Sequence, residues 1–142
     1  MRHADSETDR EAGHQTETFD GELVPDARGR TRRPEPDCPV EVALAAISGR
    51  WTTLVLRELM GGARSFSDLR AALPDLSAKV LTERLGDLTA RRLAVREELP
   101  GFPSRTSYRL TPAGLELRPL LIELYRSGSA LEGLTSQAKP GR

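Results

Sequence analysis

The sequence has very few of the side chains on which metal and catalytic sites depend. It contains one cysteine and two histidines, and both histidines lie within the first 14 residues, in a polar and acidic stretch. No cluster of His, Cys and carboxylate side chains has metal-ligand spacing, and there is no glycine-rich phosphate loop. A Ser/His/Asp set cannot be assembled in the remaining chain. We therefore expect a protein that is not an enzyme and that holds no metal ion and no cofactor.

Long apolar runs are also missing. No stretch approaches the roughly 18 apolar residues that a membrane-spanning helix needs. Residues 1–20 lack the apolar core of a secretory signal. The single cysteine, Cys38, excludes a disulfide within the chain but leaves open a disulfide between two chains. These absences predict a cytoplasmic protein that does not contact a membrane.

The formal net charge is zero, but the charges are unevenly distributed. Residues 1–26 carry eight acidic and two basic side chains, whereas residues 64–109 carry nine basic and six acidic ones. The middle of the chain is therefore mildly basic, although less so than a typical isolated nucleic-acid-binding module. Between these regions, the basic cluster at residues 28–33 could be a solvated linker or an arm that touches phosphates.

The apolar pattern divides the chain into three segments. Residues 1–36 have no apolar period and are predicted to form a disordered tail, because such a segment cannot bury enough surface to offset its ordering entropy. Residues 37–130 show helical and strand periods and are long enough for one folded domain. Residues 131–142 are predicted to be a flexible C-terminal tail.

Four helices are predicted in the first part of this domain. The first begins at Pro39, because proline suits the first helical position, and it ends at Gly49. The second begins at Trp51 and stops at Gly61. The third is short and covers residues 65–73, with Ser65 as its cap and Asp68 in its first turn.

The fourth helix follows a break at Pro74. Ser77 caps it, and it reaches Arg91 or Arg92. Its inward face is predicted from leucines at the i, i+4 and i+7 positions, namely Leu81, Leu85 and Leu88. The third helix, the break and the fourth helix together form a helix-turn-helix.

A β-hairpin is predicted after the fourth helix, because the apolar period changes to two. Residues 93–99 form the outgoing strand, residues 100–103 the turn and residues 106–110 the returning strand. Thr111 then caps a last helix in which we expect Pro119 to cause a kink.

The last helix has an apolar stripe from Leu117 to Leu131 that is longer than a small core can cover. A twofold dimer would bury it and place two helix-turn-helix units about one DNA turn apart. Packing within one chain is the alternative. The predicted fold class is therefore mainly α-helical with a small β-hairpin wing: a winged helix-turn-helix with one core and a long C-terminal dimerisation helix.

This fold predicts a sequence-specific DNA-binding transcriptional regulator, acting as a repressor or dual regulator. The second helix of a helix-turn-helix lies in the major groove of double-stranded operator DNA. The alternative is a winged-helix module that binds another protein and not DNA. That alternative would place apolar residues on the exposed face of the fourth helix, where this sequence has mainly polar ones.

The residues predicted to face DNA follow from the inward leucines. The outward and flanking residues of the fourth helix are Lys79, Val80, Thr82 and Glu83. Lys79 and Thr82 lie near the helix N-terminus and can donate to phosphates or base edges, while Glu83 can accept from a cytosine amine. Ser77, at the cap, can help to hold a phosphate. An ordinary solvated helix face is the alternative for all of them.

Arg105 is the candidate DNA contact in the wing, because it follows the turn directly. Its guanidinium can enter a minor groove or bridge a phosphate. Arg96, on the outgoing strand, is a weaker candidate. Either arginine could instead pair with Glu97 or Glu98 in a weak surface ion pair.

Several separated motifs occur along the chain: CPVE at 38–41, ISGRW at 47–51, LVLREL at 54–59, RSFSDLR at 64–70, LSAKVLTERL at 76–85 and SRTSYRLTPAG at 104–114. In this order they resemble the HxlR-type winged helix-turn-helix regulators, which are MarR/HxlR-like. The resemblance covers roughly residues 37–128. It implies a bacterial transcriptional regulator that dimerises through its first and last helices and responds to aldehydes, quinones or oxidants.

The resemblance also implies site residues. Its DNA-facing set is Ser77, Lys79, Thr82, Arg84 and Arg105. Arg84 lies on the flank of its helix and could brace the fold instead. Cys38 stands where the family has a sensing cysteine, at a helix start that favours negative charge. This implies a redox sensor with a small electrophile or oxidant as effector. A partly buried structural cysteine is the alternative.

Overall fold

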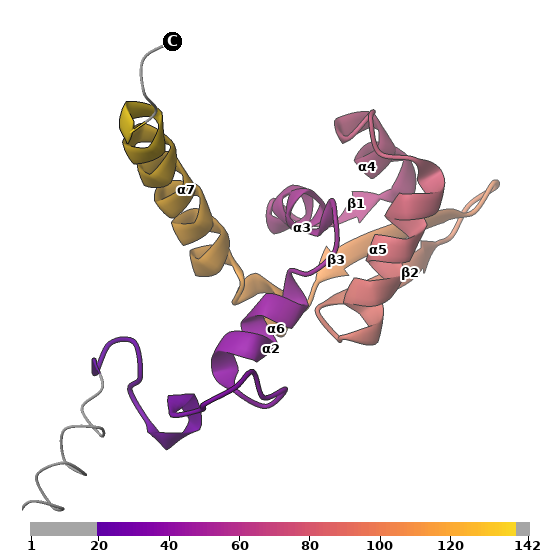
Figure 1. The fold of residues 1–142 in the computed structure, drawn as a ribbon. Helices are drawn as coiled ribbons and strands as arrows, with labels where there is room; N and C mark the ends of the chain where they lie inside the picture. Colours follow the sequence, from indigo (N-terminus) through magenta and orange to yellow (C-terminus); the bar gives the residue numbers. More distant parts are fainter. Residues whose placement is uncertain (1–19, 139–142) are drawn as a thin grey trace, which may run out of the picture. The chain divides into compact units, whose positions relative to one another are not determined.

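The computed structural model describes residues 20–138, which divide into two compact units between Leu44 and Ala45 (Figure 1). The first unit contains η1 (Ala27–Gly29), a single 3-10 turn within the segment that we predicted to be disordered. Helix α2 (Pro39–Ala46) begins in this unit, at the predicted proline. No helix in the described part of the chain is long and apolar enough to cross a membrane.

The second unit contains the other helices and a small sheet. Its elements are α3 (Thr52–Met60), β1 (Arg64–Ser65), α4 (Phe66–Ala72), α5 (Ala78–Ala90), β2 (Ala94–Leu99), β3 (Arg105–Leu110), α6 (Pro112–Leu115) and α7 (Arg118–Ala138). Helices α4 and α5 form the predicted helix-turn-helix, and β2 and β3 form the predicted wing. The arrangement is that of a winged helix-turn-helix.

The sheet is antiparallel, with β3 between β1 and β2. The β2–β3 register runs from Ala94 opposite Leu110 to Leu99 opposite Arg105. Strand β1 was not predicted. It is only two residues long and pairs with Ser107 and Tyr108 of β3, so its formation depends on a partner far away in the sequence.

The inward row predicted for α5 is confirmed. Leu81, Leu85 and Leu88 are each at most 1% exposed. They pack in one core with leucines of α3 and α4 and with Tyr108 and Leu110 of β3. Burying a leucine side chain contributes about 1.5–3 kcal/mol. The row therefore fixes which face of α5 remains open to solvent.

The predicted caps of three helices are also present. Ser65 and Asp68 form a reciprocal capping box at α4, Ser77 accepts from the Val80 amide at α5, and Thr111 accepts from the Gly114 amide at α6. Helix α3 differs from the prediction, because Trp51 is its N-cap in the left-handed conformation (φ 78°) and Thr52 is its first residue.

The last predicted helix is two helices, so the expected kink at Pro119 is wrong. Helix α6 stops at Leu115 and α7 starts at Arg118. Proline lacks an amide donor and its ring clashes with the carbonyl of the residue four positions earlier, here Leu115. The helix therefore ends and restarts with Pro119 in the first turn. Helix α7 then continues to Ala138, past the start of the flexible tail that we predicted at residue 131.

Gly114 explains how closely α6 approaches the wing. A Cβ atom at this position would overlap the backbone carbonyl oxygen of Leu93. The Leu93 carbonyl also accepts a hydrogen bond from the Thr111 amide at 3.0 Å. Only glycine lets the chain turn out of β3 against the residue that precedes β2.

Candidate nucleic-acid interface

The turn between α4 and α5 is held to the core by two leucines. Leu73 and Leu76 are 6% and 1% exposed, whereas Pro74 and Asp75 between them are exposed. The Leu76 amide donates to the Leu73 carbonyl at 3.1 Å and closes the turn. This anchoring fixes the start of α5, which is the end of the helix that meets the bases in a helix-turn-helix.

The first two turns of α5 present most of the predicted site residues to solvent. Ser77, Lys79, Thr82 and Glu83 are exposed, and Val80 is half-buried against the core. Lys79 forms no ion pair with any described residue within 4.0 Å. Its ammonium group is therefore available to an outside anion.

Two hydroxyl groups on this face already have partners within the helix. The Ser77 Oγ accepts from the Val80 amide at 3.2 Å, and the Thr82 Oγ1 donates to the Ala78 carbonyl at 2.8 Å. Each oxygen keeps a free lone pair, so Thr82 can still accept a hydrogen bond without changing its rotamer. A donor role for Thr82 would require its hydroxyl to leave Ala78.

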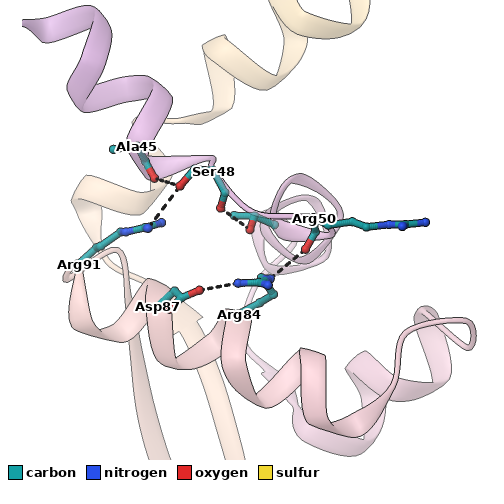
Figure 2. Close-up of polar contacts among 7 residues, drawn as sticks. Ala45, Ser48, Arg50, Arg84, Asp87 and Arg91 are labelled. Carbon is teal, nitrogen blue, oxygen red and sulfur yellow. Dashed lines mark hydrogen bonds and ion pairs between the residues drawn. The ribbon is translucent and has the colours of Figure 1, made fainter. Parts of the chain in front are cut away.

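Arg84 joins α5 to the loop that precedes α3 (Figure 2). Its Nε donates to the Arg50 carbonyl at 2.9 Å, and its Nη1 donates to Asp87 Oδ2 at 2.7 Å. The guanidinium also packs over Gly49, where a Cβ atom would come within 3.2 Å of Nη1. These contacts support the alternative in which Arg84 braces the fold.

Ser48 provides a second connection between the same loop and α5 (Figure 2). Its hydroxyl donates to the Ala45 carbonyl at 2.8 Å and accepts from Arg91 Nη2 at 3.3 Å. Its carbonyl accepts from the Thr52 hydroxyl at 2.8 Å, and the Thr52 side chain is 1% exposed. The loop is thus held to the middle of α5 by Arg84 and to its C-terminal end by Arg91.

Arg105 begins β3 on the rim of the wing and is exposed. It forms no ion pair with a described residue. The other wing arginines do: Arg109 pairs with Glu97 at 2.8 Å, and Arg96 pairs with Glu98 at 3.5 Å. The two glutamates that were considered as partners for Arg105 are therefore engaged elsewhere.

The wing returns alongside the start of α4. Residues 65–67 and residues 103–106 line one shallow groove. The groove brings the hydroxyl-bearing Ser67 and Ser104 near Arg105. Sequence reasoning singled out neither serine, because their proximity depends on β1 pairing with β3.

Comparison with known proteins identifies the family. Residues 46–133 match the family model described as HxlR-like helix-turn-helix. The chain belongs to this family. The HxlR-like match covers every element from α3 to most of α7. It makes the chain a DNA-binding transcriptional regulator and confirms the predicted resemblance.

Relatives of this HxlR-like chain are described in the same terms. It is 41% identical over 88 residues to the uncharacterized HTH-type transcriptional regulator YvaP of Bacillus subtilis, covering 61% of this chain and 82% of YvaP. The reduced redox regulator HypR superposes with a TM-score of 0.64 at 26% identity, covering 70% and 98% of the two chains. Reduced YodB from B. subtilis superposes with a TM-score of 0.57 at 31% identity, covering 63% and 88%.

The bracing role of Arg84 can be tested by unfolding. Arg84→Ala removes the donors to Arg50 and Asp87 and should lower the free energy of unfolding by about 1–2 kcal/mol. Urea unfolding monitored by Trp51, the single tryptophan, measures this. Arg105→Ala is the control and should stay within about 0.5 kcal/mol of wild type. Equal stabilities of the two variants would contradict the brace.

Proposed function

We propose that this regulator binds double-stranded operator DNA with the first two turns of α5 in the major groove and the wing on the flanking backbone. The observation behind the proposal is that α5 buries its leucine row and leaves Lys79 exposed, with no ion-pair partner among residues 20–138. An unpaired cation on the open face of a helix-turn-helix is the group that a phosphate or a guanine edge requires. Arg105 supplies a second cation, on the wing, that has no ion-pair partner in the described part of the chain.

Each predicted residue has a role that fits its environment. Lys79 donates to a phosphate or to guanine, Thr82 accepts from a base amine, and Glu83 accepts from cytosine. Ser77 lies at the helix cap beside the backbone, and half-buried Val80 offers a methyl surface to thymine. Arg84 positions α5 rather than contacting bases, since its guanidinium is already bonded to Arg50 and Asp87.

A protein-binding winged helix without DNA contact is the alternative function. Such a module would need an apolar patch on the open face of α5. The exposed residues there are Ser77, Lys79, Thr82 and Glu83, which are all polar or charged. This composition favours nucleic acid over a protein partner.

The salt dependence of DNA binding tests the proposal. The probes are DNA upstream of the protein's own gene and duplexes enriched from a random pool. Binding should weaken steeply as salt rises, because phosphate contacts release counterions. Lys79→Ala and Arg105→Ala should each reduce the slope of log K against log salt by about 1. Arg126→Ala, which removes an equal charge from α7, should leave the slope unchanged. Equal slopes for all variants would contradict the proposed contacts of Lys79 and Arg105. A wild-type protein that binds neither kind of duplex would favour the protein-binding alternative.

A homodimer is part of the proposed function. The C-terminal part of α7 leaves Leu124, Tyr125, Leu131 and Leu134 exposed by 43–79%. Leu124 and Leu131 are seven residues apart and lie on one helical face. A second copy that covers this face would hide the apolar stripe and pair two α5 helices for a twofold operator.

Sedimentation tests the dimer. The wild-type protein should sediment as a dimer at micromolar concentration, and Leu131→Glu should shift it to monomer by placing a charge in the apolar contact. Arg126→Glu is the control, because this residue is exposed and lies on the side of α7 away from Leu124 and Leu131. A wild-type monomer, or dimers of both variants, would exclude this surface.

Cys38 is the proposed site of redox regulation. HypR is described as a redox regulator, and YodB has been crystallised after diamide treatment and bound to quinone. In this chain Cys38 lies directly before α2, is 5% exposed, and has the Thr31 hydroxyl 3.9 Å from its Sγ. A buried thiol reacts only when its surroundings open, so oxidation of Cys38 would be coupled to a local structural change.

Diamide treatment tests this role. Diamide should weaken operator binding by the wild-type protein at least about tenfold, which corresponds to a coupling of about 1.4 kcal/mol. Cys38→Ser should bind equally well with and without diamide. If Cys38→Ser loses binding to the same extent as wild type, the thiol is not the sensor. Non-reducing electrophoresis then shows whether a disulfide between two chains accompanies the effect.

A further inference from the structure

The tip of the wing exposes an aromatic side chain completely. Phe102 has a relative exposure of 107%, and the nearby Leu99 is 40% exposed. In Figure 1 the tip of the β2–β3 hairpin projects beyond the helices. Exposing a whole phenylalanine forgoes the stabilisation that burying its ring would contribute. A side chain in this position is best explained by a partner that covers it.

Phe102 lies in a short turn that contains two prolines. It is flanked by Gly101, whose φ of +150° favours glycine, and by Pro103, and Pro100 begins the turn. The rings of Pro100 and Pro103 fix φ at two positions of the turn. This lowers the backbone entropy that the turn loses when it binds a partner, which is the advantage of preorganisation.

The charges near the tip favour a polyanion as that partner. Arg105 lies opposite Leu99 in the sheet register and is unpaired among the described residues. The acidic residues of the wing, Glu97 and Glu98, are paired with arginines. The tip thus combines apolar surface with one available guanidinium.

The position of the tip specifies which part of the DNA it would reach. Residues 103–106 share a groove with the start of α4, the first helix of the helix-turn-helix. On the proposed docking, with α5 in the major groove, a hairpin on the side of α4 would face the adjacent minor groove. Minor-groove proteins insert phenylalanine, leucine or proline between base steps there, next to arginines that read its negative potential.

We propose that Phe102 is an apolar wedge that enters the minor groove beside the sequence read by α5, with Arg105 on the adjacent backbone. This inference rests on the proposed DNA binding. It predicts a contribution to affinity that does not depend on salt. It also predicts a preference for flexible pyrimidine–purine steps in the flank, because these unstack at low cost.

The experiment compares variants on one duplex, the fluorescently labelled sequence enriched by the wild-type protein. Phe102→Ala should weaken binding at least about fivefold, the lower range for losing one aromatic contact to a base. Its salt slope should equal that of wild type, whereas Arg105→Ala should lower the slope by about 1. Phe102→Trp should retain affinity. Leu115→Ala, which removes another exposed apolar side chain from α6, should have no effect.

A second measurement detects the wedge directly. 2-Aminopurine placed in the flanking step should brighten when wild-type protein unstacks it, and Phe102→Ala should abolish that rise. Because Phe102 is fully exposed, its variants should unfold at the same urea concentration as wild type.

Three results would overturn the wedge. The first is equal affinity of Phe102→Ala and wild type while Lys79→Ala still impairs binding, which leaves the proposed function intact. The second is a loss of salt slope in Phe102→Ala, which would mean that the side chain only positions Arg105. The third is a wild-type protein that binds no DNA, which would remove the proposed function as well.

Discussion

The arrangement of the DNA-binding unit depends on the contact between Arg84 and the loop before α3. The buried leucines determine which face of α5 is hidden, and the turn at Leu73 and Leu76 anchors the start of the helix. Arg84 adds a polar connection from the middle of α5, because it binds the Arg50 carbonyl and packs on Gly49. Asp87 neutralises the guanidinium at 2.7 Å, so that the brace does not add a free charge to the interface. Only glycine satisfies both the +98° φ and the close approach at position 49.

Features that are encoded locally could be predicted from the sequence. The leucine period of α5, the serine and threonine caps and the alternating wing strands each depend on residues within one or two turns of each other. Strand β1 and the break between α6 and α7 could not be predicted with the same certainty. β1 depends on pairing with Tyr108, 44 positions beyond Arg64. Pro119 was predicted to disturb the last helix. The apolar periodicity of the sequence does not show whether proline bends one helix or separates two.

The same distinction between local and long-range signals applies to the residues of the candidate site. The exposure of Lys79, Thr82 and Glu83 followed from the helical angles relative to the leucines, and the structure agrees. The engagement of Arg84 could only be suspected, because its partner Arg50 lies 34 residues earlier in a loop with left-handed backbone. Phe102 was read only as part of a turn. Its placement between Gly101 and Pro103, at a hairpin tip that two strands cannot cover, is the sequence signal for its exposure.

The distribution of paired charges suggests how a protein of zero net charge can bind a polyanion. Of the nine basic side chains at residues 64–109, Arg84, Arg96 and Arg109 are paired with carboxylates inside the unit. We therefore expect a smaller electrostatic share of DNA affinity per protomer than nine basic side chains would give, since a cation that stays paired with a carboxylate neutralises no phosphate. Two features compensate in the proposed mechanism. A twofold dimer doubles the free cations on one operator, and an apolar wing tip adds affinity that salt does not screen. A regulator of this kind gains its specificity from geometry and contact rather than from a strong positive field.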